Sequence, residues 1–239
     1  MNPLLTGDPL GQSFSDDLDT SAAREEILGR IRTLQKRPAS HQAHEMAQAA
    51  AYVQRQERGP QPSAVGDVFS LFVNKSKAML CTVDVVPSLA DVPKACATYL
   101  HENKLQGEAA VWPSLASLDW AASGLRTHFG APKGDDLVGI SGVAYAVAET
   151  GTLVFASQKD EPASTHLLPE THIAVVRREQ VVHTMEDAFA RLRADGRCMP
   201  RALNFVSGPS RTADIEQTIV LGAHGPYRVH LVLVGPHHE

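Results

Sequence analysis

From residue 65 onward, short apolar runs alternate with segments whose apolar residues recur at helical spacing. The runs predict buried strands over residues 78–83, 108–112, 125–129, 138–141, 145–155, 173–176, 203–206, 218–222 and 229–234, the fifth bent at 149–151 into one or two strands. The helical segments cover residues 65–75, 92–100 and 115–120, and another begins at Thr184. Strands that alternate with helices are typical of an α/β fold with a mostly parallel, helix-covered sheet.

The first 62 residues follow a different pattern. Residues 1–20 show no sustained period and are expected to form a tail. A helix is predicted from Ser21 onward, because Ile27, Ile31 and Leu34 recur at helical spacing, and a second helix, rich in Ala and Gln, is predicted over residues 41–58. A linker is expected at residues 59–63, where Gly and Pro cluster. We therefore expect a tail and helical arm over residues 1–62 and an α/β domain over residues 63–239.

Charge and composition argue against several classes of function. A net charge of −5 and a pI near 6.1 leave no basic face for nucleic acid or an anionic membrane. Neither a membrane helix nor a basic-then-apolar leader is evident, so a cytoplasmic protein is expected. Cys81, Cys96 and Cys198 are far apart, and the 11 histidines lack ligand spacing. No disulfide framework, iron–sulfur cluster or metal site is therefore expected on this chain.

One acidic residue interrupts the most apolar stretch of the chain, residues 138–155. Glu149 is the single carboxylate of this stretch and precedes a Thr-Gly turn. Burying a carboxylate without a partner is costly, so Glu149 must serve a purpose or find a partner. Two interpretations stay open: Glu149 caps a neighbouring backbone or pairs with a distant Arg, or it is a site carboxylate that acts as a base.

A second candidate for chemistry is the segment SGPSRTADIE at residues 207–216, which follows a predicted strand. A strand, a Gly turn and a helix start direct backbone N–H groups toward an anion. Gly208 permits close approach, Ser210 and Thr212 offer hydroxyls, and Arg211 can bind a carboxylate or phosphate through two parallel hydrogen bonds. The alternative is a capped helix in which Arg211 pairs with an acidic neighbour.

His224 is the histidine most readily placed near such a site, since it lies in a Gly-flanked turn after a predicted strand. A solvated imidazole is the alternative. Open α/β sheets bind ligands in a crevice at the strand ends. The hypothesis is that Glu149 and Arg211 line this crevice around a small anion, and that His224 assists Glu149.

Three groups of motifs recur in a specific order. They are GISG at 139–142 with AETGT at 148–152, LLPETHIAVV at 167–176, and residues 207–216 with GAHGP at 222–226. As a set they resemble the LUD-domain family and, within it, the lactate-utilisation C proteins, over about residues 65–235. The resemblance implies a three-layer α/β/α fold of the ribose-phosphate isomerase and CoA-transferase-like group.

The resemblance also implies a function. It implies that the chain is a cytoplasmic component of a complex that oxidises L-lactate to pyruvate. The iron–sulfur clusters are then expected on partner proteins, and no cofactor is expected on this chain. Two alternatives stay open. The chain is a non-catalytic assembly or regulatory subunit, or it transfers acyl groups through Glu149, because AETG is also similar to the Ser-Glu-Asn-Gly segment that carries the nucleophilic Glu of CoA-transferases.

Overall fold

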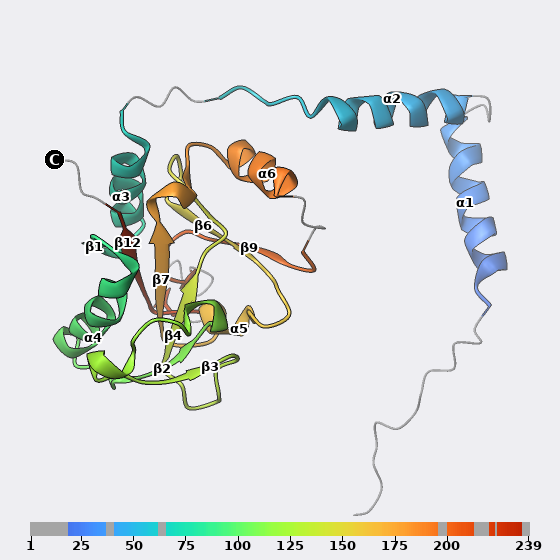
Figure 1. The fold of residues 1–239 in the computed structure, drawn as a ribbon. Helices are drawn as coiled ribbons and strands as arrows, with labels where there is room; N and C mark the ends of the chain where they lie inside the picture. The colour runs from blue at the N-terminus through green and yellow to red at the C-terminus, as the bar shows by residue number, and fades with distance from the viewer. Residues whose placement is uncertain are drawn as a thin grey trace, which may run out of the picture. The chain divides into compact units, whose positions relative to one another are not determined.

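The computed structural model describes residues 19–36, 41–61, 66–195, 200–212, 220–222 and 224–235. The chain divides into two units, Met1–Gly59 and Pro60–Glu239. The first unit contains α1 (Ser21–Gln35) and α2 (His41–Arg55) (Figure 1). The apolar residues Ile27, Ile31 and Leu34 of α1 are exposed. The predicted tail up to residue 18, part of the predicted linker and Cys198 lie outside the described residues.

The second unit is built on a central sheet of six strands (Figure 1). Their order across the sheet is β1 (Thr82–Val86), β12 (Arg228–Val234), β7 (Thr171–Arg177), β4 (Val138–Gly142), β2 (Glu108–Val111) and β3 (Arg126–Phe129). Every neighbouring pair is parallel. The prediction of an α/β fold with a mostly parallel, helix-covered sheet is confirmed.

Successive residues of a strand face opposite sides of the sheet, so the sheet buries apolar side chains on both faces. On one face, α4 (Val92–Glu102) packs Cys96 and Leu100 against the sheet residues Ile140 and Val232. All four side chains are at most 1% exposed. This face of the sheet is therefore covered by α4, together with Leu115, Trp120 and Leu125 from the segment between β2 and β3.

The other face is covered by α3 (Val68–Ala78), by the short helix α5 (Ser164–Leu167) and by a second sheet. The second sheet has the order β8 (Val181–Val182), β5 (Tyr145–Val147), β6 (Thr152–Ala156) and β9 (Leu203–Val206). Its remaining side packs on α6 (Met185–Ala194). The apolar stretch 138–155 thus serves two sheets, with β4 in the central sheet and the β5–β6 hairpin in the second one.

Gly139 explains why the first motif begins with glycine. A Cβ added to this residue of β4 would overlap the carbonyl oxygen of Thr165 and touch the ring of Pro169. Only glycine lets the backbone of α5 lie directly on β4. The close approach fixes α5 against the central sheet.

Several element boundaries differ from those predicted. The strand expected over 78–83 begins only at Thr82, because α3 continues through Ala78 and Leu80 turns the chain with a φ of 69°. The helix expected over 115–120 is replaced by two 3-10 turns, Pro113–Leu115 and Ala121–Ser123.

The helix start expected after Ser210 is wrong for Arg211–Thr212. These residues form β10, which pairs antiparallel with β11 (Val220–Leu221). Residues 213–219 lie outside the described residues.

Candidate functional site

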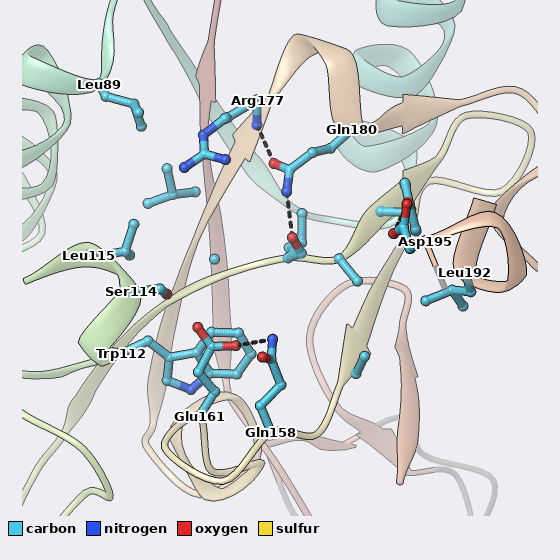
Figure 2. Close-up of a pocket in the computed structure, with 16 residues that line it drawn as sticks. Leu89, Trp112, Ser114, Leu115, Gln158, Glu161, Arg177, Gln180, Leu192 and Asp195 are labelled. Atoms are coloured by element: carbon cyan, nitrogen blue, oxygen red, sulfur yellow. Dashed lines mark hydrogen bonds between the residues drawn. The ribbon is translucent and has the colours of Figure 1, made fainter. Parts of the chain in front are cut away.

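A pocket of about 330 Å³ lies where three neighbouring parallel strands end (Figure 2). Trp112 and Ser114 follow β2, Val143 follows β4, and Arg177 is the last residue of β7. We call this hollow the carboxyl-edge pocket. Its volume is at the lower end of the range of small-molecule sites, roughly 300–1,000 Å³.

The topology explains why the sheet leaves a hollow at this place. In the strand order, β3 lies beside β2 in one lateral direction, whereas β7 and then β12 follow β4 in the opposite lateral direction. Because the connections leave in opposite directions, a crevice is expected between the carboxyl ends of β2 and β4. Such a switch point is where open parallel sheets bind their ligands.

Arg177 supplies the positive charge of the pocket. The six preceding residues of β7 are buried, and Arg177 is exposed at the end of the strand. Figure 2 shows its guanidinium directed into the hollow, and among the described residues it forms no ion pair. A free guanidinium at a concave site can bind a carboxylate through two parallel hydrogen bonds.

Gln180 holds the backbone around Arg177. Its side-chain oxygen accepts a hydrogen bond from the Arg177 backbone N–H at 2.8 Å, and its side-chain nitrogen donates to the Val143 carbonyl at 2.6 Å. One side chain therefore ties the ends of β7 and β4 together. This link sets the width of the pocket beside the guanidinium.

The opposite side of the pocket carries a carboxylate. Glu161 accepts a hydrogen bond from the Gln158 side chain at 2.8 Å, and Figure 2 places both across the hollow from Arg177. The adjacent Trp112 ring is 3% exposed and donates its indole N–H to the Pro162 carbonyl at 3.2 Å. The pocket thus has a cation on one side. The other side has the Glu161 carboxylate and the Trp112 ring, which is held by its hydrogen bond to a backbone carbonyl.

The helix α6 closes a third side. Its Leu192 lines the pocket, and Asp195 at its C-terminal end accepts a 2.6 Å hydrogen bond from the Tyr145 hydroxyl. At its N-terminal end, the Met185 backbone N–H donates to the Glu149 carboxylate at 3.1 Å. A carboxylate at a helix N-terminus satisfies a free N–H and complements the helix dipole. Glu149 therefore stabilises the helix whose other end lines the pocket.

Two buried histidines, His166 and His172, lie beside Phe155. The His166 ring stacks on Phe155 with centroids 4.0 Å apart and meets Trp112 edge-on at 5.8 Å, while His172 bonds to the Ser141 hydroxyl at 2.9 Å. Burial lowers the pKa of His166 to about 4 and that of His172 to about 3. Both rings are neutral at neutral pH, because a charged imidazole would lose its hydration here.

A protein-family model for the LUD domain matches residues 70–234. The chain belongs to the LUD domain family. The predicted resemblance to this family is therefore confirmed.

Relatives of this LUD domain carry a common name. Lactate utilization protein C of Bacillus subtilis is 37% identical over 133 residues, which cover 51% of this chain and 55% of that protein. Its counterpart from Bacillus licheniformis is 36% identical over 129 residues, covering 52% and 53%. The chain spans about half the length of these curated relatives.

A solved structure has a related fold. It is a crystal structure of a DUF162 family protein from Deinococcus radiodurans, with 25% sequence identity and a TM-score of 0.53. The match covers 73% of this chain and 100% of that one.

In this LUD domain the residues of the segment 207–212 lie at the amino edge of the central sheet, opposite the carboxyl-edge pocket. Gly208 packs on the backbone of Met79, just before β1, and the Arg211 guanidinium approaches the Met79 sulfur at 3.6 Å. Burial raises the pKa of the neighbouring Cys81 thiol to about 11, and Arg211 acts in the opposite direction.

The turn that carries His224 meets the same segment. The Ser210 backbone N–H donates to the Pro226 carbonyl at 2.9 Å, and a Cβ on Gly225 would lie 3.3 Å from the Ser210 Cβ. His224 is exposed, and Thr212 pairs with Val220 across β10 and β11. The structure thus brings Gly208, Ser210, Arg211, Thr212 and His224 into one neighbourhood.

Glu149 is not ion-paired with Arg211. Its carboxylate is directed to α6, whereas Arg211 is directed to Met79. The capping interpretation of Glu149 agrees with this contact. Ligand binding by the amino-edge residues and catalysis by Glu149 or His224 stay predictions.

Sequence reasoning missed Arg177, Gln180 and Glu161. Arg177 could have been found, because it follows the predicted strand 173–176 directly and residues that follow parallel strands gather at one edge. The other two gave no local signal. Gln180 and Glu161 lie in ordinary polar turns that only the tertiary fold brings to the pocket.

The described residues include no group of three His, Cys, Asp or Glu side chains able to hold a metal ion. None of the helices in the described ranges is both long and apolar enough to cross a bilayer.

Proposed function

We propose that this chain is a component of L-lactate utilisation and that its carboxyl-edge pocket binds a small 2-hydroxy or 2-oxo carboxylate. The relatives named lactate utilization protein C support the metabolic role. The observation that carries the ligand assignment is Arg177, an arginine without an ion-pair partner among the described residues, at a sheet switch point. Arg177 is the one cation among the described residues that line this hollow, and a single cation favours a monoanion.

The pocket can orient such a ligand by its two ends. Arg177 binds the carboxylate, and Glu161 accepts a hydrogen bond from the 2-hydroxyl group and is the candidate base for its proton. The Trp112 wall keeps water from the apolar side of the ligand. Gln180 is a positioning residue, since it acts through the backbone of Arg177.

Oxidation of L-lactate to pyruvate releases two electrons and two protons. In this proposal iron–sulfur partner proteins accept the electrons, and this chain binds and orients the carboxylate. The alternative is an assembly subunit with an empty pocket. A shared site with partners and an assembly role differ in one respect: only the first requires Arg177 to touch the ligand.

Acyl transfer through Glu149 has less support. The carboxylate already accepts a backbone hydrogen bond at the start of α6. It also lies in the β5–β6 turn, whereas the pocket is lined by the other ends of these strands, at Tyr145 and Ala156.

Isothermal titration of the full chain with L-lactate and with pyruvate tests the proposal. We expect binding by the wild type, and a loss of roughly 10- to 100-fold in Arg177→Ala, since each hydrogen bond to a charged group contributes about 1.5–3 kcal/mol. Arg177→Lys should be intermediate, and the exposed α6 variant Arg193→Ala is the matched control.

Oxidation assays with the chain's genomic neighbours then separate the two roles. If Arg177→Ala supports wild-type lactate oxidation and binds lactate as the wild type does, the pocket assignment is wrong. If no titration shows binding but the mixture still needs this chain, the assembly role is favoured.

A further inference from the structure

A second hollow adjoins the carboxyl-edge pocket. It has a volume of about 580 Å³ and lies past Arg177, at the carboxyl ends of β7 and β12. Leu89 and Arg177 line both hollows, so the two meet at these side chains. We call the second hollow the side pocket.

Three of the six residues that line the side pocket, Leu89, Val234 and Gly235, carry no polar side chain. Val234 ends β12, and Gly235 follows it, anchored by a 3.0 Å hydrogen bond from its N–H to the Val86 carbonyl. Leu89, from the turn between β1 and α4, supplies a further apolar side chain. None of these residues offers a charged group, so an aliphatic chain can cover them without leaving a buried charge unpaired.

Arg178 contributes its alkyl stem to this surface. Its guanidinium lies over the Phe69 ring, 4.5 Å from the centroid, and donates to Asp67 at 3.2 Å. A Cβ added to Gly235 would lie 2.9 Å from the Arg178 Cβ, so the stem and the Gly235 backbone are in close contact. With its charge directed to Asp67, Arg178 leaves Arg177 as the guanidinium nearest to both hollows.

The charges also limit the number of negative groups on a ligand. Arg177 offers one cation where the two hollows meet, and the exposed Glu179 adds a carboxylate to the side-pocket lining. A second negative charge on the ligand would be repelled by Glu179. The lining therefore favours a ligand with one anionic end and one apolar chain.

We infer that the side pocket is a second binding site, for an unbranched medium-chain aliphatic monocarboxylate, whose carboxylate competes with the occupant of the carboxyl-edge pocket for Arg177. The inference rests on the proposed function only in taking Arg177 as the anion-binding residue. The two hollows sort ligands by their linings: the carboxyl-edge pocket, with Glu161 and Gln158, suits a short hydroxy acid, and the side pocket suits a hydrocarbon chain. A lactate-utilising protein would thereby respond to the supply of longer carboxylates.

A homologous series tests the inference. Isothermal titration of the full chain with butanoate, hexanoate and octanoate should show affinity that rises about two- to fourfold for each added CH₂, because a fully buried methylene contributes about fourfold. Octanoate should also raise the apparent dissociation constant of L-lactate in proportion to its concentration. Equal affinity along the series, or additive binding of octanoate and lactate, overturns the inference.

Two variants locate the effect. Val234 lines the side pocket and not the carboxyl-edge pocket, so Val234→Thr, which keeps a β-branched residue in the strand, should lower the gain per CH₂ and leave lactate binding unchanged. Arg177→Ala should weaken octanoate at least tenfold. If octanoate binds Arg177→Ala as tightly as it binds the wild type, it binds at another place on the protein and the inference is overturned.

The failures of the two proposals are distinguishable. Lactate binding without a chain-length gain refutes the side-pocket site and leaves the proposed function standing. A chain-length gain that depends on Arg177, without any lactate binding, refutes the lactate assignment and leaves the side-pocket site standing.

Discussion

The two edges of the central sheet use similar residues for different purposes. At the carboxyl edge, Arg177 is directed into a hollow and has no ion-pair partner among the described residues. At the amino edge, Gly208 lies against the Met79 backbone and Arg211 against the Met79 sulfur. A glycine turn followed by an arginine is typical of anion sites, yet the same residues also serve close packing. The hollow, rather than the residue types, distinguishes the two edges.

Acid should have the largest effect, and it acts on buried histidines in the core of the α/β unit. In the folded protein His166 and His172 have pKa values lowered by burial to about 4 and about 3, whereas in the unfolded chain histidine has a pKa near 6.5. Below pH 6.5 the unfolded chain therefore binds protons that the folded protein cannot. These two histidines together should lower the free energy of unfolding by roughly 5 kcal/mol between pH 6.5 and 4. His230, whose pKa burial also lowers to about 4, adds to this fall.

Urea denaturation at several pH values measures this fall. His166→Gln should lower stability at pH 8 but reduce the slope of stability against pH between 6.5 and 4. The exposed His101→Gln serves as the control and should leave the slope unchanged. An unaltered slope in His166→Gln would contradict the assignment of a neutral buried ring.

Gly208→Ala tests whether the amino edge is closely packed. The new Cβ would overlap the Met79 carbonyl oxygen, and the residue has a φ of 79°, where a side chain is strained. We expect a loss of about 2–4 kcal/mol in the free energy of unfolding, measured by denaturant titration. Gly134→Ala, where an added Cβ meets nothing within 4 Å, is the matched control. Equal stability of both variants would show that the amino edge has room for a ligand.

Arg177→Ala and Arg211→Ala compare the two edges directly. Arg177→Ala should weaken lactate binding by about 2 kcal/mol with little change in the free energy of unfolding. Arg211→Ala should change the free energies of lactate binding and of unfolding by no more than about 0.5 kcal/mol. Titration calorimetry and thermal melts measure the two quantities. The reverse pattern would transfer the binding site to the amino edge and support the site predicted from the sequence.

Glu149→Gln should have the smallest effect. The amide oxygen still accepts a hydrogen bond from the Met185 N–H, but the negative charge at the start of α6 is lost. We therefore expect the free energy of unfolding to fall by about 0.5–1 kcal/mol. Thermal unfolding measures this loss, and incubation with acyl-CoA followed by mass spectrometry provides the second readout. A wild-type adduct that Glu149→Gln lacks would instead favour a nucleophilic role for Glu149.

The local pattern of the chain determined the elements and their alternation. Strand 173–176, the helix that begins after Thr184 and the division of 138–155 at Glu149 follow from apolar runs, a capping box and a turn signal, and all three occur in the structure. The motifs also determined the family. These features depend on neighbours within a few residues, so one sequence carries them.

Only the tertiary structure decided where the hollow lies. Strand order is set by side-chain packing between segments far apart in the chain, and no local pattern states that β4 lies between β2 and β7. That order leaves the gap into which Arg177, Gln180 and Glu161 converge, and it carries the segment 207–212 to the other edge. A polar side chain acquires a binding role from the space in front of it, and that space belongs to the packed fold.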